Sequence, residues 1–238
     1  MSDCPVEKLH YRVIAESTVN YDEAAPLYEE TEHFKMSLDS QQATFEMKAL
    51  YPQSKARAIV EQYLNCWHVL IGLEQQPEQL RVEFVSADTL PSESSTDSDA
   101  ITPIVQKKFP PLPKNFALSP DVETMYLRYK AYQQQQESLT SMAYICLAVF
   151  ELSAGGRRQA ARRYRVSKSV LKTLSVLCTP ISERVDVVKK HVEFIPLSPQ
   201  EKKWIMVTIK KLIKRVGEWT ANPEGYFEKI TLENLPKL

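Results

Sequence analysis

The amino-acid sequence predicts an α+β protein, in which a small N-terminal sheet with one packed helix precedes an all-helical C-terminal domain. Before residue 91, several segments alternate apolar and polar side chains, as half-buried strands do. Residues 91–100, PSESSTDSDA, contain no apolar anchor before the final alanine. From Ser119 onward, the apolar residues instead recur at helical spacing. We therefore expect the sheet and the helices to be joined by a linker.

The N-terminal part contains the segments with strand-like alternation, which are HYRVIAEST (10–18), HFKMSLD (33–39), ATFEMKAL (43–50) and LRVEFVSADTL (80–90). SQQ-type turn residues separate the second segment from the third, so these two are expected to form a hairpin. Ser54 begins a helix. Its apolar residues fall on one stripe that would pack on the sheet, namely Ile59, Val60, Tyr63, Leu64, Trp67, Leu70 and Ile71.

We expect an α+β domain at 1–90, a linker at 91–118, a helical domain at 119–225 and a C-terminal tail at 226–238. The linker begins with a Ser- and Asp-rich stretch expected to be disordered, and the Pro-rich KKFPPLPKNFALSP that follows is expected to be extended. The serine-proline pairs at 119–120 and 198–199 are typical of helix starts, and Glu201 completes a capping box with Ser198. The predicted helices are 120–136, 139–153, 157–164, 168–178, 183–192 and 199–217.

Cysteines and histidines are too scattered to predict a metal site. Cys4, Cys66, Cys146 and Cys178 form no CxxC pair, and Cys66 and Cys146 lie in apolar helical patterns typical of reduced, buried thiols. The histidines show no clustered ligand spacing. P-loop, GxGxxG, HExxH and GxSxG motifs do not occur in the sequence. We therefore expect no metal and no cofactor.

The sequence also favours a cytoplasmic protein with no membrane partner. Its N-terminus lacks the basic-then-apolar pattern of a signal peptide. The most apolar run, residues 139–152, is about 14 residues long and includes Glu151, which suits a core helix rather than a membrane span. Glu151 needs a partner in such a helix, and an arginine of the basic segment that follows is the expected one. Another acidic group, Glu29, Glu30 and Glu32, is expected to form a solvated turn before a strand.

A basic segment, GGRRQAARRYRVSKSVLKTL (155–174), carries the most pointed functional signal. Lysine and arginine are equal in number to aspartate and glutamate over the whole chain, yet every charged residue from Leu152 to Ser182 is basic. Such a one-sign patch is the electrostatic footprint of a phosphate-binding surface. Its apolar residues have the spacing of two short packed helices, and these are Ala161, Tyr164, Val166, Leu171 and Leu174.

This segment resembles the helix-turn-helix of bacterial regulators. It has a small residue, a bulky residue three positions later, then Val-Ser, and apolar residues five and eight positions after that valine. Arg165 stands where the family usually has a glycine, and arginine is disfavoured at positive φ. The resemblance implies that the second helix presents Lys168, Ser169, Lys172 and Thr173 to the edges of bases. Phosphate contacts are expected from Arg162, Arg163 and Arg165, and Arg157 and Arg158 are also expected to bind nucleic acid. The alternative is a pair of bundle helices with a solvated basic face.

The C-terminal part also resembles the HEPN-type helical domains of prokaryotic defence and toxin systems. Helices 120–136 and 139–153 would pack with a later pair that ends in 199–217. In the active members, an arginine and a histidine four to six residues apart cleave RNA without a metal ion. Arg184 and His191 stand in RVDVVKKH with six residues between them, although Val185 follows the arginine where that family has a polar residue.

Three classes of function therefore remain open. We expect first a non-enzymatic protein whose helix-turn-helix-like segment binds DNA or RNA, or which scaffolds a complex that does, with a protein partner for the N-terminal domain. The second is a HEPN-like ribonuclease or an inactive relative, acting through Arg184 and His191 in defence or stress. The third is a protein-interaction module whose basic segment docks an acidic partner.

Overall fold

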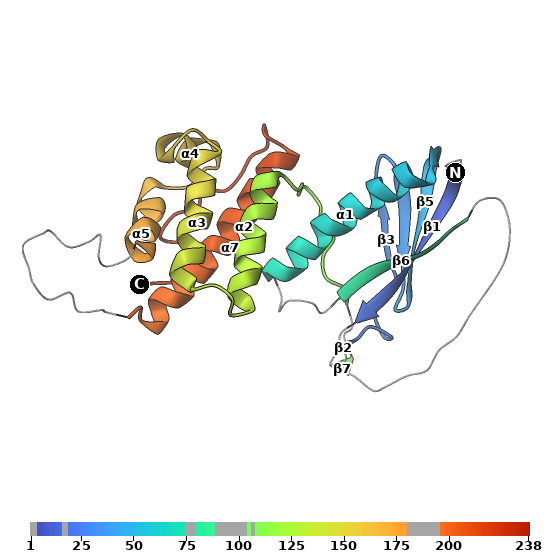
Figure 1. Cartoon of the computed structure of the whole chain (residues 1–238), viewed down its shortest axis with the longest axis horizontal. Coiled ribbons are helices and arrows are strands. Elements are labelled where there is room, and N and C mark those ends of the chain that lie inside the picture. The colour runs from blue at the N-terminus through green and yellow to red at the C-terminus, as the bar shows by residue number, and fades with distance from the viewer. Residues whose placement is uncertain (1–3, 16–18, 75–79, 89–103, 106–107, 180–195) are drawn as a thin grey trace, which may run out of the picture. The chain divides into compact units, whose positions relative to one another are not determined.

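The computed structural model describes residues 4–15, 19–74, 80–88, 104–105, 108–179 and 196–238. The chain forms two compact units, Met1–Lys114 and Asn115–Leu238. The first holds the sheet and the second is helical, so the predicted α+β class is confirmed (Figure 1). The segment predicted to be disordered, 91–100, and the predicted helix 183–192 lie outside the described residues.

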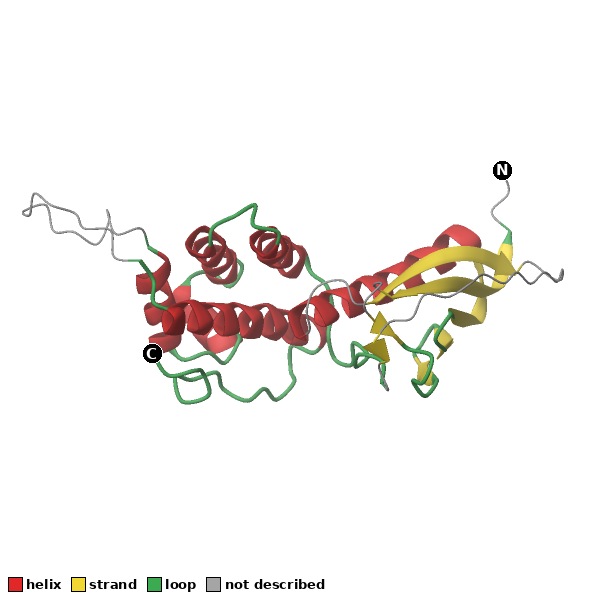
Figure 2. Ribbon diagram, turned by 90° about the horizontal axis from the view of Figure 1, so that it is seen from below, coloured by secondary structure: helices red, strands yellow, loops and turns green. Residues whose placement is uncertain are grey.

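The first unit is a five-stranded sheet in the order β3-β4-β5-β1-β6, with all its pairs antiparallel. The strands are β1 (Pro5–Ala15), β3 (Leu27–Glu30), β4 (Phe34–Leu38), β5 (Gln42–Pro52) and β6 (Leu80–Asp88). Helix α1 (Gln53–Glu74) connects β5 to β6 and packs on β1, β5 and β6 (Figure 2). Strands β2 (Val19–Asn20) and β7 (Ile104–Val105) form a separate parallel pair.

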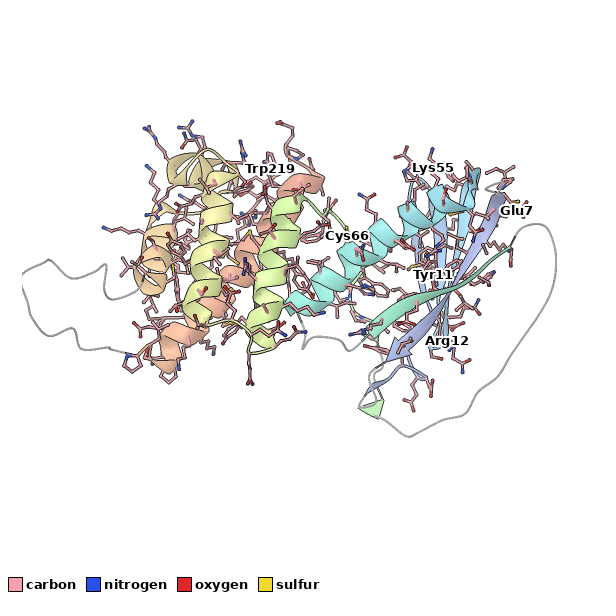
Figure 3. All side chains as sticks on the ribbon, in the orientation of Figure 1. Glu7, Tyr11, Arg12, Lys55, Cys66 and Trp219 are labelled. Carbon is pink, nitrogen blue, oxygen red and sulfur yellow. The ribbon has the colours of Figure 1, made fainter. Side chains whose placement is uncertain are left out.

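The period-2 pattern of the strands determines which face packs on α1. Phe34, Met36 and Leu38 of β4 are buried while Lys35 and Ser37 between them are exposed, as alternation requires. The predicted hairpin is confirmed by the β4–β5 pairing. Its turn is held by the Asp39 carboxylate, which accepts hydrogen bonds from the backbone amides of residues 41 and 42 at 2.9 and 2.7 Å. Tyr11 of β1 lies in this core, with its ring edge against Phe45 (Figure 3).

The prediction of a solvated turn at the glutamate cluster was wrong for Glu29 and Glu30. Both residues belong to β3, where Glu29 pairs with Met36 across the ladder. The strand is only four residues long and lies at the edge of the sheet, and charged side chains are common on edge strands because they discourage further pairing. Glu30 forms an ion pair of 2.7 Å with Lys48, and this hydrogen bond lowers the pKa of the Glu30 carboxyl.

The second unit contains α2 (Pro120–Gln133), α3 (Leu139–Leu152), α4 (Arg157–Arg163), α5 (Lys168–Cys178) and α7 (Pro199–Ala221). Helix α3 contacts each of the other four, so its apolar sequence forms the centre of the unit (Figure 1). The predicted caps are present. Ser119 Oγ accepts a hydrogen bond of 3.3 Å from the Val122 amide, and Ser198 and Glu201 form the reciprocal capping box.

Helix α7 continues four residues beyond the predicted end at Gly217. The glycine is not a terminator, because the ring of Phe116 packs against it. A Cβ atom at position 217 would overlap that ring, and the backbone amide of Ala117 donates a hydrogen bond of 3.0 Å to the Gly217 carbonyl. Close approach of the chain, rather than a helix end, therefore requires glycine here.

The units also extend beyond the boundaries predicted from the sequence. Phe109, within the predicted linker 91–118, is buried and stacks on Tyr21 with a ring separation of 4.9 Å. Trp67 of α1 donates a hydrogen bond of 3.0 Å to the Pro111 carbonyl, so this proline-rich stretch packs on the first unit. Ile230, in the predicted tail 226–238, is buried in the second unit. Apolar and aromatic anchors inside both segments account for the difference.

Candidate nucleic-acid interface

Helices α4 and α5 form a packed pair that is joined by a short turn. Ser167 caps α5, with its Oγ accepting a hydrogen bond of 3.3 Å from the Val170 amide. The inner sides of the pair are fully buried and consist of Ala160, Tyr164, Val166, Val170, Leu171 and Leu174. The small buried residue is Ala160 rather than the predicted Ala161, which is half-buried, because α4 is rotated by one position from the predicted phase.

Arg165 occupies the turn in the left-handed conformation, with φ at 49°. The turn is a Schellman motif. The amide of Val166 donates to the Ala161 carbonyl at 3.0 Å, and the amide of Arg165 donates to the Arg162 carbonyl at 3.4 Å. Glycine is the usual residue at this position, and a residue with a Cβ atom there costs about 1–2 kcal/mol. The turn therefore keeps the geometry that favours glycine while carrying an arginine.

The outer side of α5 is open to solvent within its unit. Lys168, Ser169 and Lys172 are exposed and Thr173 is half-buried. These are the residues predicted to face base edges, and they lie on the first two turns of α5, opposite the buried Leu171 and Leu174. The Ser169 hydroxyl lies 2.8 Å from the Ser167 hydroxyl, next to the cap.

Two of the predicted nucleic-acid-binding arginines make contacts within the unit, although neither is buried. Arg157 forms an ion pair of 2.5 Å with Glu151, which confirms the predicted partner of that carboxylate. Arg163 donates a hydrogen bond of 2.8 Å to the Ser153 carbonyl, and its guanidinium lies over the ring of Trp219 of α7, labelled in Figure 3. A carboxylate in an apolar helix and a carbonyl at a helix end both need donors, and these two arginines supply them.

The remaining basic residues form what we call the α4–α5 basic surface, which consists of Arg158, Arg162, Arg165, Lys168 and Lys172. All of them are exposed, and none forms an ion pair with a residue that the structure describes. Arg158 and Arg162 stand one helical turn apart on α4 and line an open hollow of about 210 Å³ together with Gln159. An unpaired, one-sign surface of this kind attracts phosphate groups.

The C-terminal tail borders this surface at the turn, a contact that the sequence did not predict. Ile230 forms an isolated parallel bridge with Val166. Its amide donates to the Arg165 carbonyl at 2.9 Å, and its carbonyl accepts from the Ser167 amide at 2.8 Å. The ring of Tyr226 lies under the Arg165 guanidinium, 5.2 Å from ring centroid to guanidinium carbon. Backbone and side chain of Arg165 are thus both held by the tail.

Arg215 of α7 ties the same tail to the turn from inside the unit. The residue is only 7% exposed, and its guanidinium donates to the Tyr164 carbonyl at 2.8 Å and to the Glu228 carbonyl at 2.7 Å. A third bond of 3.0 Å reaches the Glu218 carboxylate. One signal in the sequence could have indicated this role. Arg215 comes three residues after Leu212, so it lies on the apolar stripe of its helix, where an arginine is out of place unless it is bonded inside the fold.

The buried cysteines match their predicted role. Cys66 and Cys146 are buried, and burial raises the pKa of the Cys146 thiol to about 12, so that it is protonated and unreactive near neutral pH. Within the described ranges, His, Cys, Asp and Glu form no group of three that could hold a metal ion. Arg184 and His191, the predicted ribonuclease pair, lie outside the described residues.

Among the helices that the structure describes, no single one is long and apolar enough to cross a membrane, and only α3 and α4 joined across a 79° bend meet that criterion of length and composition. Comparisons of the chain with protein-family models, with curated proteins and with solved structures found no match.

Proposed function

We propose that this protein binds duplex DNA through the α4–α5 basic surface, with α5 in the major groove. The observation that supports this most directly is the exposure of Lys168, Ser169 and Lys172 on one side of a capped helix with no acidic neighbour in sequence. The major groove of B-form DNA is about 12 Å wide and admits a helix of this kind. In such a complex, the N-terminal turns of the helix meet base edges.

In this arrangement, α4 would lie against the phosphate backbone. Arg158 and Arg162 point from the outer side of α4 and flank one hollow, so both guanidinium groups can approach one stretch of backbone. Duplex DNA is favoured over duplex RNA because the major groove of an A-form helix is deep and too narrow for an α-helix to enter. An acidic protein partner would use the same charges without requiring an exposed helix that fits a groove.

The test is binding of a fluorescein-labelled duplex of mixed sequence, measured by fluorescence anisotropy at several salt concentrations. With three phosphate contacts, from Arg158, Arg162 and Arg165, the slope of log K against log salt should be about −2.7, which corresponds to about 40-fold weaker binding at 200 mM than at 50 mM. Duplex RNA of the same sequence and an acidic polypeptide are the competitors. Binding that lacks salt dependence, or that either competitor displaces as well as DNA, would overturn the proposal.

Two charge reversals refine this test. Arg162→Glu should lower the affinity and reduce the magnitude of the salt slope by about 1 or more. Lys168→Glu, made separately, should lower the affinity for duplex DNA more than Arg162→Glu does. Lys203→Glu, at an exposed position of α7, is the matched control because it changes the net charge equally. Its position lies about 18 Å along the helix from Arg215, which contacts the turn. An equal loss in all three variants would indicate a bulk-charge effect rather than a site.

A further inference from the structure

The Arg165 side chain has no hydrogen-bonding or ion-pairing role among the described residues, although its backbone conformation carries a strain that glycine would avoid. Its guanidinium is exposed and its described contact is the Tyr226 ring. Strained residues persist where the surrounding structure holds them, and they concentrate at functional sites. An arginine kept at a glycine position therefore points to a use for its side chain outside the fold.

Residues of the C-terminal tail hold Arg165 in place. Ile230, which bridges to Val166, hydrogen-bonds to the residues on either side of that valine, the Arg165 carbonyl and the Ser167 amide. Two residues before Ile230, the Glu228 carbonyl accepts a hydrogen bond from Arg215, which anchors the tail to α7. Tyr226, 85% exposed, then presents its ring to the guanidinium. A ring at this distance favours one direction for a guanidinium without neutralising it, so the charge stays available to a phosphate.

The position of this pair fits the proposed interface. Arg165 stands three residues before Lys168, at the end of α5 that would enter the groove. We propose that the C-terminal tail is a part of the DNA-binding surface, in which Tyr226 is a positioning residue that aims Arg165 at a backbone phosphate. This inference rests on the proposed function, and it adds to that function a segment far from the helix pair in sequence.

The experiment is a double-mutant cycle on duplex DNA affinity, with Tyr226→Ala and Arg165→Gly alone and combined. Glycine is chosen at 165 because it accepts the positive φ. Tyr226→Ala should weaken binding by about 2- to 5-fold, Tyr226→Phe should restore it because the ring remains, and Tyr226→Ala should have no effect in the Arg165→Gly chain. The salt slope should be the same in Tyr226→Ala as in the wild type, since no charge changes.

The outcomes separate this inference from the proposed function. If the wild-type protein does not bind duplex DNA, the proposed function fails. If the wild type binds and Tyr226→Ala binds equally well, or loses the same factor with and without Arg165, the positioning role of Tyr226 is wrong while the proposed function stands. Because Tyr226 is exposed, its truncation should leave the thermal midpoint within about 2 °C of the wild type. A larger drop would mean that the ring serves the fold, and would also overturn the inference.

Discussion

The left-handed turn at Arg165 allows a stability prediction that does not depend on any ligand. Both Arg165→Gly and Arg165→Ala remove the guanidinium and its contact with Tyr226, so the difference between the two variants reports the backbone alone. At φ of 49°, alanine retains a strain of about 1–2 kcal/mol that glycine does not have. Glycine loses about 0.5–1 kcal/mol through the greater entropy of its unfolded state. Glycine should therefore be the more stable variant by about 0.5–1 kcal/mol.

This order is the reverse of the one expected at an ordinary helix or strand position, where alanine is favoured. Urea unfolding followed by far-UV circular dichroism, which is dominated by the helices of the second unit, measures the difference, and a thermal scan should show a midpoint about 2–4 °C higher for glycine. An alanine variant that is as stable as the glycine variant would refute the reasoning, because it would mean that residue 165 does not need positive φ. Arg165→Gly should bind DNA more weakly than the wild type, separating stability from binding.

Two further predictions concern neighbouring features. Arg157→Ala should lower stability by about 1 kcal/mol because it leaves the Glu151 carboxylate without its cation, whereas Arg158→Ala should leave stability unchanged and reduce the salt slope of DNA binding by about 1. A loss of stability in Arg158→Ala together with a smaller salt slope in Arg157→Ala would show that the two roles are exchanged. Gly217→Ala should cost about 1–3 kcal/mol in urea unfolding because the new methyl group overlaps the Phe116 ring, and Phe116→Leu should relieve part of that cost. If the stability losses of Gly217→Ala and Phe116→Leu simply add in the double variant, the proposed overlap between residue 217 and the Phe116 ring is wrong.

Local signals in the sequence were sufficient to predict the helices that carry the candidate interface. A serine-proline start, a capping glutamate and helical apolar spacing each act within one or two turns, and the structure has the caps at Ser119, Ser167 and Ser198. The hairpin followed from alternation and turn residues in the same way. The exposure of Lys168 and Lys172 is the geometric consequence of burying Leu171 and Leu174 on the opposite side of α5.

Contacts between distant segments could not be predicted, because they leave no local pattern. The four-residue strand β3 is too short for its alternation to stand out, and its glutamates resemble a solvated turn. Arg157 and Arg163 belong to the same basic run as Arg158 and Arg162, and only the positions of Glu151 and of the Ser153 carbonyl show that these two make bonds within the unit. The bond from Arg215 to the Tyr164 carbonyl joins residues 51 positions apart. Composition does not encode such a pairing.

At Arg165, the residue present is not the one that the local backbone conformation favours. A left-handed turn after a helix favours glycine, and residue 165 has the positive φ of such a turn, yet the residue is arginine. A strained residue requires support from elsewhere, and here the tail provides two backbone hydrogen bonds and an aromatic contact to the same turn. A glycine would have made that support unnecessary for the geometry of the turn. The combination of a costly residue and a dedicated support is explained if the guanidinium itself is what the turn is built to present.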